Sequence, residues 1–71
     1  MLTKESILQF FFDKQGREYI CMQHIVGCCH TPYFILKEFN STNEYPYNQK
    51  GERLDHKLRV VLDSSFNIEF N

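Results

Sequence analysis

The chain has 71 residues, of which 42% are hydrophobic and 24% charged, and its formal net charge is −1. A chain of this length forms one small domain, here residues 1–71, and excludes a large catalytic cleft, while its apolar content excludes disorder. Eight basic residues are interspersed with nine acidic ones, which disfavours nucleic acid as a partner, because phosphate binding draws most of its affinity from a basic patch.

The N-terminal stretch MLTKESILQFFF lacks the pattern of a signal peptide. Lys4 and Glu5 precede a short apolar run, and no small-residue cleavage site follows that run. No apolar run in the chain approaches the roughly 20 residues needed to cross a bilayer. These features predict a cytoplasmic protein without a membrane partner, whose cysteines are reduced thiols.

The stretch LTKESILQFFFDKQG predicts a helix at the N-terminus. Thr3 is a suitable N-cap, and Gly16 provides a C-terminal stop. Apolar residues follow helical spacing at Ile7, Leu8, Phe11 and Phe12. The alternative is a hairpin over FFFDKQGREYI, with a type I turn closed by Gly16 in the left-handed region. We favour the helix, at least through Phe10.

The segment 17–26, REYICMQHIV, predicts a central strand. The chain contains no alanine and 15% aromatic residues, a composition that favours strands. A period of two divides the segment into two faces, and both are largely apolar. One face comprises Tyr19, Cys21, Gln23 and Ile25, and the other Ile20, Met22, His24 and Val26. After a break at Gly27 and Pro32, YFILKEF predicts a second strand over 33–39.

The segment 40–52, NSTNEYPYNQKGE, predicts a long polar loop that carries the binding residues. Tyr45 and Tyr47 flank Pro46 in it, and exposed aromatic side chains commonly anchor interfaces. With Asn43 and Asn48 they are the predicted partner-binding residues. The alternative is that the two tyrosines fold back as a lid over the core.

The last segment, KLRVVLDSSFNIEF, predicts a hairpin with strands at 57–63 and 66–70. Turn-forming residues occupy positions 63–65 between them. The predicted architecture is therefore α+β, with the N-terminal helix packed on a four-stranded antiparallel sheet. Helices over 21–30 and 52–62 are the alternative to the strands there.

Two looser resemblances accompany these alternatives. With helices over 21–30 and 52–62 and the final FNIEF strand, the order of elements resembles a winged-helix module. The stretch GERLDHKLRVV would then be the recognition helix, which implies duplex DNA as the partner. If all segments are strands, the chain resembles a small SH3-like or Tudor-like barrel.

The stretch CMQHIVGCCH raises the question of a metal site. It holds every cysteine and two of the three histidines. Structural zinc usually takes four ligands from two separate pairs. On a strand, Cys21 and His24 point to opposite faces, whereas on a helix Cys21, His24 and Cys28 share one side, with His30 or His56 as a fourth ligand. We favour the strand, and therefore expect thiols that act as packing groups, with no metal and no cofactor.

The functional expectation is a non-enzymatic protein-binding module that regulates or inhibits a larger protein. A thiol nucleophile at Cys28 or Cys29 would need activation by His30 or His56 and a third group to orient that base, so we expect no enzyme. A homodimer through an edge strand is another use of the same surface. Nucleic-acid binding and zinc binding are the alternative functions.

Overall fold

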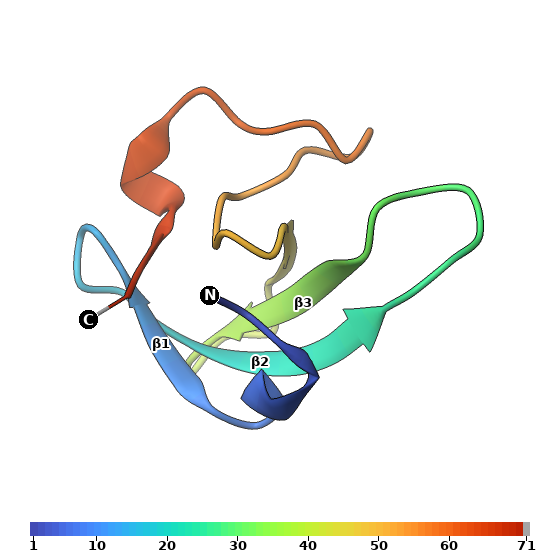
Figure 1. Ribbon diagram of the computed structural model, residues 1–71. Coiled ribbons are helices and arrows are strands. Elements are labelled where there is room, and N and C mark those ends of the chain that lie inside the picture. Colours follow the sequence, from blue (N-terminus) through green and yellow to red (C-terminus); the bar gives the residue numbers. More distant parts are fainter. Residues whose placement is uncertain (71) are drawn as a thin grey trace.

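The computed structural model describes residues 1–70, and its main element is one antiparallel sheet of five strands. The strands are β1 (Phe10–Asp13), β2 (Glu18–Ile25), β3 (Tyr33–Glu38), β4 (Glu44–Tyr47) and β5 (Ile68–Glu69), in the spatial order β4-β3-β2-β1-β5. Figure 1 shows the sheet curling beneath the N-terminal segment and the C-terminal third of the chain. The sheet is thus a half-barrel, with one face covered by these segments.

The predicted α+β class is wrong, because no long helix is formed at the N-terminus. The only helical structure there is η1 (Lys4–Ser6), one turn of 3-10 helix that Thr3 caps with its side chain. The phenylalanine run forms β1 instead and pairs with β2, so that Phe10 lies opposite Ile20. Aromatic residues lose side-chain freedom in a helix and pack well on a sheet, and here a tight turn brings β2 alongside them. Of the alternatives, the one in which all segments are strands is closer to the observed secondary structure than the winged-helix one.

The turn between β1 and β2 forms the hairpin that the sequence offered as the alternative to the N-terminal helix. The Gly16 N–H donates to the Asp13 carbonyl at 3.0 Å, and the Asp13 N–H donates to the Arg17 carbonyl at 3.0 Å. Gly16 has φ +83°, a conformation that costs glycine little and other residues more. The Asp13 side chain also accepts the Gln15 and Arg17 N–H groups. This closure fixes the register of β1 and β2.

The same turn occurs three times within residues 1–70. Residues 48–52 and 55–59 repeat both backbone hydrogen bonds of residues 13–17, and their first side chain, Asn48 or Asp55, accepts two backbone N–H groups as Asp13 does. The fourth residue of each turn is left-handed: Gly16 (φ +83°), Gly51 (φ +81°) and Leu58 (φ +62°). Only the third turn places a bulky side chain in this position.

A β-bulge in β2 changes which side chains face the core. Cys21 lies opposite Leu36, but Gln23 lies opposite Ile35, so Met22 is the extra residue. One extra residue reverses the alternation beyond it. His24 therefore faces the same side as Cys21, and the predicted two-face division of 17–26 is wrong after position 21.

The remaining predicted elements agree with the structure only in part. Strand β3 matches the predicted strand at 33–39, but β4 lies inside the segment 40–52 predicted as loop. The predicted strand at 57–63 contains only an isolated bridge between Val60 and Leu54. In the predicted strand at 66–70 only Ile68–Glu69 pair, as β5, after the 3-10 turn η2 (Ser64–Phe66). Within residues 1–70, neither 21–30 nor 52–62 is helical.

The core lies on the concave face of the sheet. Its fully or almost fully buried apolar residues are Leu2, Tyr19, Cys21, Phe34, Leu36, Tyr47 and Ile68. They come from four strands and the N-terminal segment, whose Leu2 N–H donates to the Gln49 carbonyl at 2.9 Å. The chain ends and the sheet therefore share one core, and burial of each large side chain contributes about 1.5–3 kcal/mol.

Replacing Gly51 with alanine should destabilise the fold more than replacing Gly16. Both sites have positive φ, which costs an L-residue about 1–2 kcal/mol. A Cβ at Gly51 would also lie 2.7 Å from Phe70 Cε2 and 3.0 Å from Ile68 Cβ, whereas a Cβ at Gly16 meets nothing within 4 Å. Urea unfolding of Gly51→Ala and Gly16→Ala measures the difference, for which we expect at least about 1 kcal/mol. Equal losses would mean that residues 48–52 do not pack against β5 as described.

Candidate binding surfaces

The Arg53 side chain donates hydrogen bonds to two tyrosine hydroxyls. Its Nε and Nη2 donate to the Tyr47 hydroxyl at 3.0 and 2.8 Å, and Nη2 also donates to the Tyr19 hydroxyl at 3.0 Å. Both tyrosines are buried in the core. The guanidinium thus satisfies two buried hydroxyl groups, which would otherwise carry a desolvation cost.

The same guanidinium lies between two aromatic rings. Its central carbon is 3.8 Å from the Tyr45 ring centroid and 4.4 Å from that of Phe66. Arg17 also lies over Phe66, at 4.7 Å. Stacking of this kind favours arginine over lysine because the guanidinium is planar. The stack joins β4 to the 3-10 turn η2, and so holds the C-terminal segment on the sheet.

The Asp13 carboxylate accepts hydrogen bonds from two residues of this network, Tyr19 and Arg17. Its Oδ2 accepts from the Tyr19 hydroxyl at 2.9 Å and from Arg17 Nε at 2.6 Å. Burial raises the pKa of Asp13, but hydrogen bonds from Arg17, Tyr19 and Gln15 outweigh burial and hold the pKa below its ordinary value. Burial and the bond to Asp13 raise the pKa of Tyr19 strongly. The phenol therefore stays protonated and donates to the carboxylate.

The predicted partner-binding residues lie in two different environments. Tyr47 is fully buried and Tyr45 is half-buried on Arg53, which corresponds to the alternative in which the tyrosines cover the core. The Asn48 side chain accepts two N–H groups within its own turn and donates to Glu52 at 2.9 Å. Asn43 directly precedes the first residue of β4 and is exposed. The structure does not bring these four side chains together, and their role in binding stays a prediction.

The outer face of the sheet carries exposed aromatic side chains. Phe10 and Phe12 are 51% and 50% exposed, and alternation along β1 directs them away from the core face that Phe11 contacts. Phe39, 47% exposed, packs edge-on against Phe10 with ring centroids 5.9 Å apart. Ile20, opposite Phe10 on β2, extends the surface. We call Phe10, Phe12, Ile20 and Phe39 the aromatic face.

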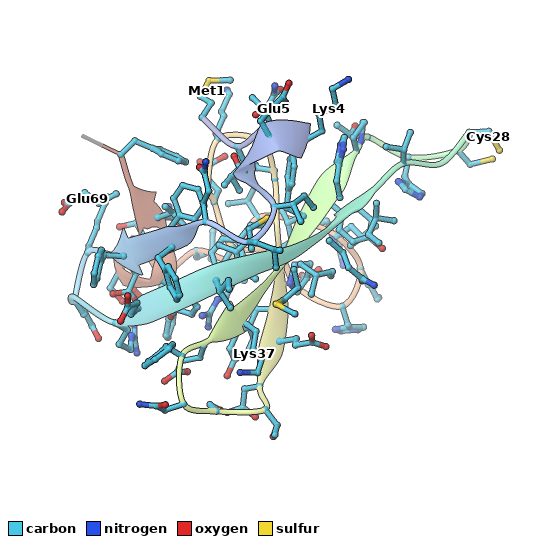
Figure 2. All side chains as sticks on the ribbon, turned by 90° about the horizontal axis from the view of Figure 1, so that it is seen from below. Met1, Lys4, Glu5, Cys28, Lys37 and Glu69 are labelled. Carbon is cyan, nitrogen blue, oxygen red and sulfur yellow. The ribbon has the colours of Figure 1, made fainter. Side chains whose placement is uncertain are left out.

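No chain segment covers the aromatic face in the part of the protein that the structure describes. Figure 2 views the sheet from below, with β2 crossing in front and no other ribbon before it. The predicted helix through Phe10 does not place these rings on a sheet, so this surface was not expected from the sequence. The signal that would have found it is the run of three phenylalanines before a turn-forming Asp13, since a strand there exposes alternate rings.

Two open grooves lie on either side of the Thr31–Pro32 segment. One, of about 390 Å³, is formed by the N-terminal segment with His24, Phe34 and Gln49. The second, of about 400 Å³, lies between the 30–33 segment and the 54–60 segment. We call the second the Leu58 groove. Its lining residues are His30, Thr31, Pro32, Tyr33, Asn48, Leu54, Lys57, Leu58 and Val60.

The cysteines and histidines of 21–30 are spread over different environments. Cys21 is buried, and burial raises the pKa of its thiol. The His24 ring stacks on Phe34 with centroids 4.5 Å apart. Cys28 and Cys29 are exposed with their sulfur atoms 3.1 Å apart, at the tip of the β2–β3 hairpin, where Figure 2 shows Cys28 far from the body of the sheet. Packing thus describes Cys21 and not the other two.

The structure also bears on metal ligation and on membrane spanning. Across residues 1–70, no three side chains among His, Cys, Asp and Glu are arranged to hold a metal ion. No helix in this same range has the length and apolar character required to cross a bilayer.

Comparison of the chain with protein families, with curated proteins and with solved structures gives no match.

Acidification should destabilise the protein through Asp13. Because its folded pKa lies below the ordinary value of 3.8, its contribution to stability is complete above that value and is lost as the pH falls through the folded pKa. Asp13→Asn should cost about 2–3 kcal/mol at pH 7 and reduce the loss of stability in acid. Urea unfolding at pH 7 and pH 3 measures both effects.

Asp63→Asn is the matched control, because Asp63 also has a lowered pKa but an exposed side chain bonded only within its own turn. It should change the free energy of unfolding much less than Asp13→Asn does. If Asp13→Asn behaves in the same way, the carboxylate does not support the Arg17 and Tyr19 contacts.

Proposed function

We propose that this chain is a non-enzymatic protein-binding module that docks onto a larger protein through the aromatic face. The observation that supports this is the exposure of three phenylalanine rings on one uncovered side of the sheet. In an antiparallel sheet with one solvated face, the side chains that point to that face are normally polar. Apolar side chains grouped on such a face are typical of interaction sites, and aromatic residues are enriched at their centres.

The size of the aromatic face fits a non-obligate contact. A phenylalanine buries about 150–250 Å² when fully covered, so three half-exposed rings offer roughly 300 Å². A standard interface covers about 800 Å² per partner, with polar residues around an apolar centre. On this molecule, whose accessible surface is 4814 Å², such a footprint takes about one sixth of the surface. The partner in this proposal is therefore a different, larger protein and not an obligate second copy.

Charged residues around the face complete the polar rim. Lys37 of β3 lies opposite Ile20, and Glu44 of β4 lies opposite Lys37. Glu18 of β2 lies opposite Phe12. Both signs of charge are present, so the rim supports orientation of a partner surface that has its own mixed charges.

The double variant Phe10→Thr, Phe12→Thr should lose partner binding while it keeps the fold. Threonine retains β-propensity but removes the rings. A photo-cross-linking phenylalanine analogue at position 12 identifies the partner, and calorimetry with the purified partner then measures affinity. We expect a loss of at least about 30-fold, as for a hot spot, and a change in unfolding free energy below about 1 kcal/mol.

Leu62→Thr is the control, because Leu62 is 99% exposed and lies outside the aromatic face. It should leave affinity unchanged. Equal affinities of the wild type and the double variant would refute the proposal. Light scattering that shows a dimer in the wild type and a monomer in the double variant would replace the larger partner with a second copy of this chain.

A further inference from the structure

The third of the repeated turns carries a side chain that its backbone disfavours. Residues 55–59 form the same hydrogen bonds as 13–17 and 48–52, but Leu58 takes the left-handed position that glycine occupies in the other two. A bulky residue at positive φ is strained, and such strain persists where the side chain serves another purpose.

The Leu58 side chain forms part of a groove wall and is not in the core. It is partly buried and absent from the buried cluster. With Leu54 and Val60 it lines one side of the Leu58 groove, and Pro32 and Tyr33 line the other. Glycine at position 58 would relieve the backbone and remove this wall. The strained leucine thus supplies part of the apolar lining of a groove on the surface.

The lining of the groove contains basic side chains and no carboxylate. Lys57 and His30 are among its lining residues, and no Asp or Glu is. The nearest carboxylate along the chain, Asp55, accepts the N–H groups of Lys57 and Arg59, which lowers its pKa and directs it into its own turn. An occupant that complements this groove is apolar and carries a negative charge.

We propose that the Leu58 groove receives an extended segment of the partner protein in which an acidic side chain is flanked by apolar ones. The apolar side chains contact Leu54, Leu58 and Pro32, and the carboxylate pairs with Lys57. This inference rests on the proposed function, because it names the chemistry of the partner segment. The groove volume of about 400 Å³ lies within the range of roughly 300–1,000 Å³ that is usual for ligand pockets.

The test uses the peptide acetyl-Leu-Glu-Leu-Leu-amide and its Glu→Gln counterpart, titrated into the ¹⁵N-labelled protein. The Glu peptide should shift the amide resonances of residues 30–33 and 54–60 and bind at least fivefold more tightly than the Gln peptide. Lys57→Gln should remove that difference, and Leu58→Gly should weaken binding of both peptides at least fivefold. Leu58→Gly should also melt at the same or a higher temperature than the wild type.

Three outcomes would overturn the inference. One is equal affinity for the two peptides, which includes the absence of binding, and another is shifts confined to other residues. The third is a lower melting temperature of Leu58→Gly without a loss of peptide affinity, which would make Leu58 a structural residue. The Phe10→Thr, Phe12→Thr variant keeps the groove and should bind the Glu peptide normally. If peptide binding fails while the partner is still captured through the aromatic face, the inference falls and the proposed function stands.

Discussion

The guanidinium of Arg53 lies between the rings of Tyr45 and Phe66 and donates to the hydroxyls of Tyr19 and Tyr47. These contacts join a C-terminal third with little regular structure to a curved sheet. The cysteines of this chain are free, and a domain of this length buries only part of its apolar surface. Directional polar contacts, which include those of the Asp13 carboxylate, therefore stabilise the packing of the C-terminal third on the sheet. In a larger domain, burial of apolar surface alone would do this.

This arrangement explains why the two faces of the sheet differ. The N-terminal segment and the chain after β4 both pack on the concave side, as Figure 1 shows, and share Leu2, Tyr47 and Ile68 as core residues. Both segments therefore cover the same face. The other face keeps Phe10, Phe12 and Phe39 in water, and this is the surface for which we propose a protein partner.

Local turn chemistry was predictable from the sequence, whereas pairing was not. Thr3 was identified as a cap and does cap η1, but the turn ends after three residues, because the phenylalanines gain more by pairing with β2 than by continuing a helix. Gly16 was identified at positive φ in both alternatives. Tyr47 was predicted to be an exposed binding residue. No sequence pattern shows that its hydroxyl accepts hydrogen bonds from Arg53 and that the ring is buried in the core. The aromatic face was missed for the same reason, since it depends on which partner strand lies beside β1.

The extra residue in β2 has a consequence for comparing this chain with others. Since Met22 has no counterpart opposite it in β3, the inward and outward positions exchange beyond it. A related chain without that residue would align correctly only with a gap at position 22. An ungapped alignment would equate outward-facing Gln23 here with a core position there, and every substitution pattern from 23 to 25 would be interpreted on the wrong side of the sheet.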